Sequence, residues 1–395
     1  MCFHALFDLK MKNVAILGST GSVGSSSLEV LRANKNEFEV KLLVANKNYE
    51  SLIKQYREFR PSYIYLHDKK ARQELLSTLD KSELGSSLIT GEDELNHLLS
   101  SDELDIVVAA IVGIAGLNSV TNAVKSGKHI LLANKESYIV AGEILNKLSN
   151  ESGATIFPID SEHSAIHQCL SGIKDQKSIS KLILTGSGGP FLDRDINTFN
   201  EITPEEAISH PVWNMGPKIS VDSSTMMNKC LEIIEARWLF NNKNIEVLIH
   251  PEGIVHSLVE FVDKSLVAQL SVPDMKIPIA YGLGYPSKID SAASSLNFET
   301  YSNLSFRHPD FHKFPSLNLA RQCIEEGGNS PIVINAVNEV SVDAFLKGKI
   351  GYLDIYNLIS EILDKTDIKV VKKVEDIFEQ DKQSRAMAME LIGTY

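Results

Sequence analysis

The sequence predicts an α/β protein with a doubly wound (Rossmann-like) parallel sheet at its N-terminus, an α+β domain in the middle and an all-α helical bundle at its C-terminus. Three observations predict this order: apolar runs alternate with helical patterns up to about residue 160, strands and helices mix after residue 170, and helical spacing alone follows residue 315. Alternating apolar strands and helices are typical of a parallel sheet covered on both faces. A chain of 395 residues is also too long to fold around one ordinary core, so two or three domains are expected.

Short apolar runs give the strands expected in the first domain. They lie at 13–17, 38–45, 62–66, 105–111, 129–133 and 154–159. Helical patterns separate them. We therefore expect residues 11–160 to form one doubly wound domain, and residues 1–10, which precede Met11, to lie outside the fold.

The second domain is expected over residues 161–300. A helix begins after Thr203, with Pro204 at its first position. The pattern of residues 224–240 predicts a longer helix with one apolar stripe, formed by Met227, Leu231, Ile234 and Trp238. Three runs at 244–250, 254–262 and 265–272 predict successive antiparallel strands, and a linker at 301–314 leads into a helical domain at 315–395.

Composition narrows the class of protein. The net charge of −12 argues against a surface for nucleic acid or an anionic membrane. Cys2, Cys169, Cys230 and Cys323 form no CxxC pair, which suits a reducing compartment. No run approaches the roughly 18 apolar residues of a membrane span, and the first residues resemble no signal or transit peptide. A soluble cytoplasmic protein is therefore expected.

Three glycines stand in the first strand-to-helix turn, at Gly18, Gly21 and Gly24. Glycines there let the backbone approach a pyrophosphate, which also meets the positive end of the helix. Their spacing is G-x-x-G-x-x-G rather than the usual G-x-G-x-x-G, so a tight turn without a ligand is the alternative. Their place in the first βα unit favours a dinucleotide site.

The end of the second strand indicates which dinucleotide binds. An NAD site carries Asp or Glu there for the ribose 2′-hydroxyl. This chain has Asn46, Lys47 and Asn48, and no carboxylate before Glu50. A cation at this point favours a 2′-phosphate, and hence NADP(H); an exposed polar turn is the alternative.

A carboxylate cluster follows the strand that ends near residue 159. Asp160 and Glu162 lie two residues apart at the carboxyl edge of the sheet, where two hard oxygen donors suit Mg²⁺ or Mn²⁺. His163 and His167, four apart, open a zinc alternative. A third interpretation is helix capping by Asp160 or Ser161. These residues alone do not choose between the three.

The helix at 224–240 presents an amide, an ammonium and a carboxylate together. Asn228, Lys229 and Glu232 share one face, away from the apolar stripe. This combination suits a phosphorylated, metal-chelating ligand, although a solvated charged face is common on any helix. Glu235 is either a further ligand or a structural ion-pair partner.

Two loops complete the candidate site. Three glycines around Ser187, in residues 184–191, are able to wrap a phosphate with backbone amides. Residues 209–218 place His210 and Trp213 between prolines and glycine, which predicts a loop that closes over a substrate and excludes water. An ordinary core position is the alternative for Trp213.

At this point the chain resembles the 1-deoxy-D-xylulose 5-phosphate reductoisomerase family. The resemblance is carried by "GSTGSVG", "LLANKES", "PIDSEHSAI", "LTGSGGPF", "HPVWNMGPKISVDSSTMMNKCLEIIEARWLF" and "HPEGIVHS", and it covers essentially residues 11–395. It implies conversion of 1-deoxy-D-xylulose 5-phosphate to 2-C-methyl-D-erythritol 4-phosphate, on the non-mevalonate (MEP) route to isoprenoids. The carbon skeleton rearranges by a retro-aldol/aldol route, and NADPH then reduces the aldehyde. One divalent cation (Mg²⁺, Mn²⁺ or Co²⁺) and a homodimer are also implied.

The resemblance further assigns roles to individual positions. It implies that the metal is held by Asp160, Glu162 and Glu232. Catalytic roles fall on Lys135, Glu162, His163, His210, Trp213 and Glu232. Substrate contacts, chiefly to the phosphate, fall on Lys135, Ser161, Ser187, His210, Ser223, Asn228, Lys229 and Glu232. NADPH contacts fall on Thr20, Gly21, Ser22, Val23, Asn46, Lys47, Asn48, Asn134, Glu136 and Gly216. His256 matches a supporting imidazole, and His167 matches no role. Cys230 stands where some relatives carry glycine, with no functional change expected.

Two other functions are weighed against this one. A metal-dependent phosphatase would use the carboxylates to activate water but leaves the nucleotide domain unexplained. A non-catalytic NADP-binding sensor would not need three carboxylates beside a lysine-bearing helix face. Both therefore account for fewer of the motifs.

Overall fold

The computed structural model describes residues 11–79, 81–85, 87–173, 175–213 and 215–393. The expected extension at 1–10 lies outside these residues. The chain divides into two compact units, and neither is one contiguous range. The first contains the chain up to Asn134, Lys147–Asp160 and Asp274–Ala293; the second contains Lys135–Asn146, Ser161–Pro273 and the chain from Ser294. Among the described helices, none combines the length and the apolar character needed to cross a bilayer.

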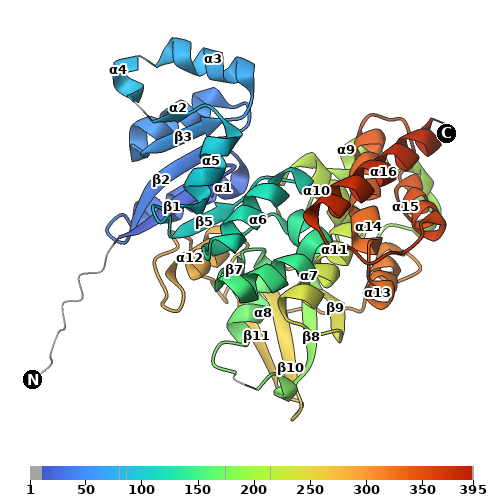
Figure 1. The fold of residues 1–395 in the computed structure, drawn as a ribbon. Helices are drawn as coiled ribbons and strands as arrows, with labels where there is room; N and C mark the ends of the chain where they lie inside the picture. The colour runs from blue at the N-terminus through green and yellow to red at the C-terminus, as the bar shows by residue number, and fades with distance from the viewer. Residues whose placement is uncertain (1–10, 80, 86, 174, 214, 394–395) are drawn as a thin grey trace, which may run out of the picture. The chain divides into compact units, whose positions relative to one another are not determined.

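The first unit is built on a seven-stranded sheet of order β4-β3-β2-β1-β5-β6-β7, in which every neighbouring pair is parallel (Figure 1). This confirms the doubly wound sheet. The strands are β1 (Lys12–Leu17), β2 (Phe38–Ala45), β3 (Tyr63–Leu66), β4 (Leu88–Ile89), β5 (Ile106–Ala109), β6 (His129–Leu132) and β7 (Thr155–Pro158). The helices are α1 (Ser22–Ala33), α2 (Tyr49–Phe59), α3 (Lys69–Thr78), α4 (Lys81–Leu84), α5 (Glu92–Ser100), α6 (Leu117–Lys125) and part of α7 (Lys135–Ser152), with a 3₁₀ turn η1 (Ile114–Gly116).

A later segment of the chain completes this unit. The helix α12 (Lys276–Gly284) packs against α1, and its Ile279, Ala280 and Leu283 belong to the same apolar core as the strands. His129 of β6 contacts the backbone oxygen of Gly282 through Nε2 at 2.9 Å. The sequence indicated strands and helices for this unit but not this returning helix.

The second unit contains a four-stranded sheet of order β11-β10-β8-β9, formed by β8 (Ile179–Gly186), β9 (Ile245–Ile249), β10 (Val255–Phe261) and β11 (Leu266–Leu270). β10 is antiparallel to β11, as expected, and also to β8. β9 runs opposite to β10 as well, but it is not the neighbour of β10 and instead pairs with β8 in parallel. The physical reason is the long connection between β8 and β9, which includes helices and so allows a parallel crossover.

Helices make up the rest of the second unit, and the last four, orange to red in Figure 1, form the expected C-terminal helical region. They are α13 (Ser316–Glu326), α14 (Ser330–Leu346), α15 (Asp354–Lys365) and α16 (Val374–Ile392). The others are α8 (Ser161–Cys169), α9 (Pro204–Ala207), α10 (Pro217–Ser224) and α11 (Met227–Leu239), with 3₁₀ turns η2 (Gln176–Ser178) and η3 (Ile196–Glu201). Thr203 caps α9 in a capping box with Pro204 at the first position, as predicted.

The helix expected over 224–240 is interrupted at its start. α10 ends at Ser224, Met226 adopts a left-handed conformation with φ +58°, and α11 begins at Met227. The apolar residues Met227, Leu231 and Ile234 are buried as expected. Lys229, Cys230, Glu232 and Glu235 are buried as well, so α11 is covered on all sides. The alternative of a solvated charged face is therefore wrong.

Candidate active site

The turn between β1 and α1 is so tightly packed that two of its three positions with glycine have no room for a side chain. Gly18 has φ +90°, and a Cβ there would lie 2.5 Å from the backbone oxygen of Ala110. A Cβ on Gly24 would lie 2.4 Å from the backbone oxygen of Gly18. Gly21 is the N-cap of α1 and has more room. The backbone of this turn is therefore tightly packed. The helix α1 begins just after Thr20, at Ser22 and Val23, and no side chain of the described residues caps its first backbone amides, so these amides remain available to an anion.

The polar turn after β2 is exposed, as a cofactor ribose would require. Asn46, Lys47 and Asn48 all lie on the surface of the first unit. The side chain of Asn48 accepts a hydrogen bond from the amide of Ser51 at 3.0 Å and so caps α2. Asn134 is buried, and its amide donates to the backbone oxygens of Ile111 and Gly113. The turn thus offers Lys47 as a surface cation, whereas Asn134 braces the loop after β5.

Carboxylates meet around the start of α8 and the middle of α11. Glu162, in the first turn of α8, and Glu232, which is fully buried in α11, come from positions 70 residues apart within the second unit. Asp160 ends the first unit and is separated from Glu162 by Ser161 alone. One oxygen from each of the three carboxylates lies within 4.8 Å of the others. This is a set of hard oxygen donors of the kind that Mg²⁺ and Mn²⁺ prefer.

Lys229 lies at the centre of this cluster. Its Nζ donates to Glu162 Oε1 at 2.8 Å, to Glu232 Oε2 and to the backbone oxygen of Thr185. Burial alone would lower the pKa of Lys229, but the two carboxylates outweigh that effect and raise the pKa above its ordinary value. Gly186 makes room for this side chain, because a Cβ there would lie 2.9 Å from the Lys229 Cε.

The remaining polar groups of the cluster surround Glu232. Lys135 Nζ donates to Asn228 Oδ1 at 3.0 Å and lies 3.4 Å from Glu232 Oε1. The Asn228 amide also donates to Glu232. Ser161 Oγ donates to Glu162 Oε2 at 2.5 Å. The residues predicted from the helix face and from the "PIDSEH" motif therefore lie together.

His163 is fully buried between two residues of α11. Its Nε2 lies 2.9 Å from the backbone oxygen of Glu232, and its Nδ1 lies 3.2 Å from Glu235 Oε2. Of the two roles left open for Glu235, this contact matches the structural partner, although Asp160, His163 and Glu235 also form a second group of potential ligands. Among the described residues, His167 belongs to neither group of three, which agrees with its being an ordinary helix residue.

The two predicted loops meet at Ser187 and His210. The amides of Val212 and Trp213 donate to His210 Nδ1 at 3.1 and 2.9 Å, so the proton is on Nε2, which lies 3.2 Å from Ser187 Oγ. Burial lowers the pKa of His210, so that the ring is neutral near pH 7. Gly189, with φ +68°, allows the first loop to approach Ser223 closely, because a Cβ there would lie 2.7 Å from the Ser223 backbone oxygen.

Trp213 and His256 lie near each other, with ring centroids 6.4 Å apart. Burial also lowers the pKa of His256, whose Nε2 contacts the Ser271 backbone oxygen at 3.2 Å. Residues 209–216 adopt no helix or strand where they are described, and α10 begins at Pro217 with Gly216 as its N-cap. Asn214 of this expected closing loop lies outside the described residues.

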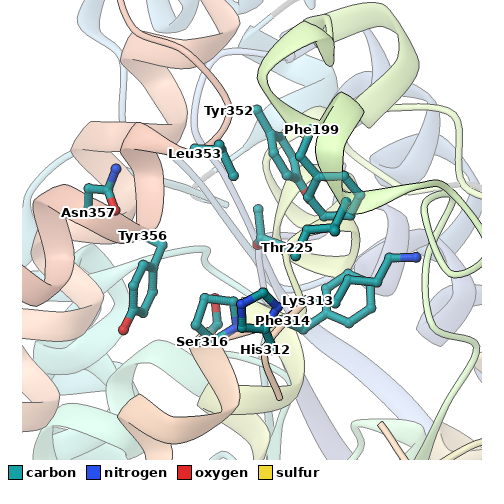
Figure 2. A pocket seen from close by; sticks show the side chains of 12 residues that line it. Phe199, Thr225, His312, Lys313, Phe314, Ser316, Tyr352, Leu353, Tyr356 and Asn357 are labelled. Atoms are coloured by element: carbon teal, nitrogen blue, oxygen red, sulfur yellow. The ribbon is translucent and has the colours of Figure 1, made fainter. Parts of the chain in front are cut away.

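A separate cavity of about 250 Å³ lies beside the connection between α10 and α11 (Figure 2). Phe199, Phe314, Tyr352 and Tyr356 give it aromatic walls, and Thr225 is the residue that it shares with this connection. The Tyr352 hydroxyl donates to the backbone oxygen of Ser224 at 2.7 Å. None of the residues predicted for the site lines this cavity.

Comparison with known proteins identifies the family of this chain. Family models described as 1-deoxy-D-xylulose 5-phosphate reductoisomerase, its C-terminal domain and the DXP reductoisomerase C-terminal domain match residues 14–142, 156–240 and 270–387. The chain is 45% identical to 1-deoxy-D-xylulose 5-phosphate reductoisomerase of Shewanella frigidimarina, over 97% of this chain and 100% of that protein. It is 44% identical to the enzyme of Haemophilus ducreyi, over 96% and 98%.

Solved structures give the same result. The reductoisomerase from Zymomonas mobilis in complex with NADPH has a TM-score of 0.90 at 37% identity, over 98% of this chain and 100% of that one. A DOX-P reductoisomerase in complex with NADPH, fosmidomycin and magnesium has a TM-score of 0.91 at 41% identity, over 97% and 98%. Sequence and fold agree over nearly the whole length of these proteins, and the chain belongs to the 1-deoxy-D-xylulose 5-phosphate reductoisomerase family.

Proposed function

We propose that this chain is an NADPH- and divalent-metal-dependent reductoisomerase that converts 1-deoxy-D-xylulose 5-phosphate to 2-C-methyl-D-erythritol 4-phosphate in isoprenoid biosynthesis. The observation that carries the proposal is the cluster around Lys229, in which a buried ammonium and the buried carboxylate of Glu232 on α11 meet the partly buried carboxylate of Glu162 on α8. Buried charges are rare in a merely structural helix, because each costs free energy unless it is paired. Relatives that share 37% and 41% of the sequence bind NADPH, and one of them binds magnesium and fosmidomycin.

The metal is held, on this proposal, by Asp160, Glu162 and Glu232. Three carboxylates within 4.8 Å of one another fit a hard divalent cation in number, charge and chemistry. When bound, such a cation acts as a Lewis acid that stabilises negative charge on substrate oxygens. We include Mn²⁺ beside Mg²⁺, because the same donors suit both ions. The ammonium of Lys229 meanwhile balances Glu162 and Glu232.

The phosphate of the substrate is held by the loops and by α10 and α11. Ser187, Ser223 and Asn228 supply neutral donors, and Lys229 supplies a charge-assisted one. The Nε2 proton of neutral His210 is directed at Ser187 Oγ and so orients that hydroxyl. Lys135 stands beside Asn228 and Glu232 as the second cation on the substrate side. Trp213 covers the site and excludes water.

NADPH binds, on this proposal, at the turn from Thr20 to Val23, with its 2′-phosphate near Asn46, Lys47 and Asn48. The closed turn at Gly18 and Gly24 and the exposed cation Lys47 are the supporting observations. The family resemblance adds Asn134, Glu136 and Gly216. We further propose residues 11–160 as the NADPH domain, whose core α12 completes, 161–300 as the catalytic domain apart from α12, 301–314 as a linker and 315–395 as a helical domain, in a cytoplasmic homodimer.

The test follows NADPH absorbance with 1-deoxy-D-xylulose 5-phosphate and Mg²⁺ or Mn²⁺. Oxidation is expected only when the ketose phosphate and the metal are both present, and activity with NADH at equal low concentration is expected to be weaker. Asp160→Asn should abolish turnover and leave NADPH binding nearly unchanged. Asp343→Asn, on the exposed face of α14, is the matched control and should behave as the wild type. Absence of metal-dependent oxidation in the wild type would refute the proposal.

A further inference from the structure

A second charge cluster, with two buried carboxylates, lies in the second unit, apart from the carboxylate site. Lys218 is the second residue of α10, and its Nζ lies 2.8 Å from Asp222 Oδ2 and 3.3 Å from Glu136 Oε1. The side chains of Glu136 and Asp222 are only 7% and 1% exposed. The amide of Asn338, on α14, donates to Asp222 Oδ1 at 2.9 Å. One cation therefore faces two buried carboxylates, and the helical region contributes a neutral donor.

The cluster is held in its charged form by its own members. Burial alone would lower the pKa of Lys218, but Asp222 and Glu136 outweigh it and raise that pKa. Burial would likewise raise the pKa of Glu136, but the attraction of Lys218, together with a backbone hydrogen bond and the charge of Lys135, outweighs it and lowers that pKa. Removing the ammonium would leave two buried carboxylates without their cation, which is costly in a low-dielectric environment.

Lys218 joins the starts of two helices that the chain separates by 82 residues. Glu136 lies in the first turn of α7, directly after Lys135, and Lys218 lies in the first turn of α10, which Gly216 caps. The far end of α10 is tied separately, by the bond from the Tyr352 hydroxyl to the Ser224 backbone oxygen. Tyr352 reaches this point from the wall of the aromatic cavity (Figure 2). α10 is therefore held at both ends, at its start by Lys218.

We propose that Lys218 is a positioning residue for the cofactor. By binding Glu136 it fixes the first turns of α7 and α10 in one arrangement, so that Glu136 and the Gly216 backbone are presented together to NADPH. Lys218 acts through these two positions. This inference rests on the proposed function, because the cofactor role of Glu136 and Gly216 comes from the family resemblance. The pair of Lys218 and Glu136 arranges the two helix starts before the cofactor binds, so that binding does not have to order them.

The test is a fluorescence titration of full-length Lys218→Gln with NADPH, in the absence of substrate and metal. Loss of a charge-assisted hydrogen bond corresponds to roughly a tenfold to hundredfold change in an equilibrium constant, so we expect the Kd for NADPH to rise about tenfold or more. Lys218→Arg, which keeps the charge, should restore binding to within about threefold of the wild type. The Mn²⁺ affinity, measured by electron paramagnetic resonance, should stay within about threefold. That separation of the two affinities would not result from a general loss of structure.

Lys181 offers the matched control, because it also pairs with two carboxylates, Glu246 at 3.0 Å and Glu260 at 3.4 Å, on the sheet of the same unit. Lys181→Gln should leave NADPH binding unchanged. If Lys218→Gln does not fold by circular dichroism, Lys218→Gln with Asp222→Asn carries the same test, because one of the two abandoned carboxylates is then gone. Unchanged NADPH affinity in the folded variant, or an equal loss of NADPH and Mn²⁺ affinity, would overturn the inference. A wild type that does not bind NADPH would overturn the proposed function as well.

Discussion

Replacing Lys229 by methionine tests whether its ammonium balances the charge of the carboxylate cluster in place of a metal cation. Methionine keeps an unbranched apolar stem of similar reach and removes only the charge. In the structure that charge contacts Glu162, Glu232 and the Thr185 backbone oxygen. Without it, two carboxylates face each other in a buried place with no cation between them.

The magnitude follows from the loss of one partner of a buried ion pair. Breaking such a pair costs about 3–5 kcal/mol, because the remaining charge is buried and unpaired. For a unit of this size, a change of 1 kcal/mol moves Tm by roughly 2–4 °C. The metal-free Lys229→Met protein should therefore unfold roughly 6–20 °C below the metal-free wild type.

A divalent cation should recover much of this loss. At one hundred times its Kd, a ligand that binds only the folded state stabilises it by about 2.7 kcal/mol. In the variant the cation meets two uncompensated carboxylates, whereas in the wild type it meets carboxylates already bound by Lys229. We therefore expect Mg²⁺ to raise Tm more in Lys229→Met than in the wild type, although the variant binds the phosphorylated substrate poorly.

The assay is thermal unfolding followed by circular dichroism, with chelator and then with increasing Mg²⁺. Lys181→Met is the control, because its ammonium is paired but lies near the surface. Its Tm should fall much less than that of Lys229→Met, and Mg²⁺ should raise it no more than it raises the Tm of the wild type. Two results would refute the reasoning: a metal-free Tm equal to that of the wild type, or a smaller Mg²⁺-induced rise in the variant.

Three further predictions concern other parts of the molecule. Glu235→Gln keeps an acceptor for the His163 ring and should change the Mn²⁺ affinity less than about threefold. Glu232→Gln, in contrast, should lower the Mn²⁺ affinity more than about tenfold. Equal losses of Mn²⁺ affinity in the two variants would make Glu235 a ligand. Gly24→Ala places a Cβ 2.4 Å from the Gly18 backbone oxygen, so it should cost about 1–3 kcal/mol in thermal unfolding and weaken NADPH binding; an unchanged Tm would contradict the tight turn. Burial lowers the pKa of His129 below its usual 6.5. The neutral ring therefore stabilises the fold above that pH, and this contribution is lost as the pH falls below it. His129→Gln should flatten the resulting fall of Tm at acid pH, and an unchanged profile of Tm against pH would exclude the buried ring as its cause.

The sequence predicted the first unit well because its signals are local. Short apolar strands, helix patterns between them and glycines at Gly18 and Gly24 each depend on a few neighbouring residues. The pairing of β9 with β8 was missed, because strand direction depends on what the intervening chain does in space. The returning helix α12 was missed for a similar reason, since its contribution to the first core comes from residues more than 100 positions beyond the last strand of that sheet.

The candidate site was predicted as a list of residues more completely than as a set of contacts. Periodicity placed Asn228, Lys229 and Glu232 on one face of a helix, but periodicity does not distinguish a polar face in water from a polar face in a buried site. The burial of Lys229 and Glu232 within α11 resolves that ambiguity. The contact between His163 and Glu235, and that between Lys218 and Glu136, join residues far apart in the sequence and had no local signal.

The division of the chain also determines how it can be dissected experimentally. The chain crosses from one unit to the other after residues 134, 146, 160, 273 and 293. A fragment ending at residue 160, the natural choice from a linear diagram, would lack Ile279, Ala280 and Leu283, which belong to the apolar core of the first unit. Such a fragment would expose that core to water and aggregate. An isolated cofactor-binding fragment would instead require residues 274–293 to be joined to it by an engineered linker.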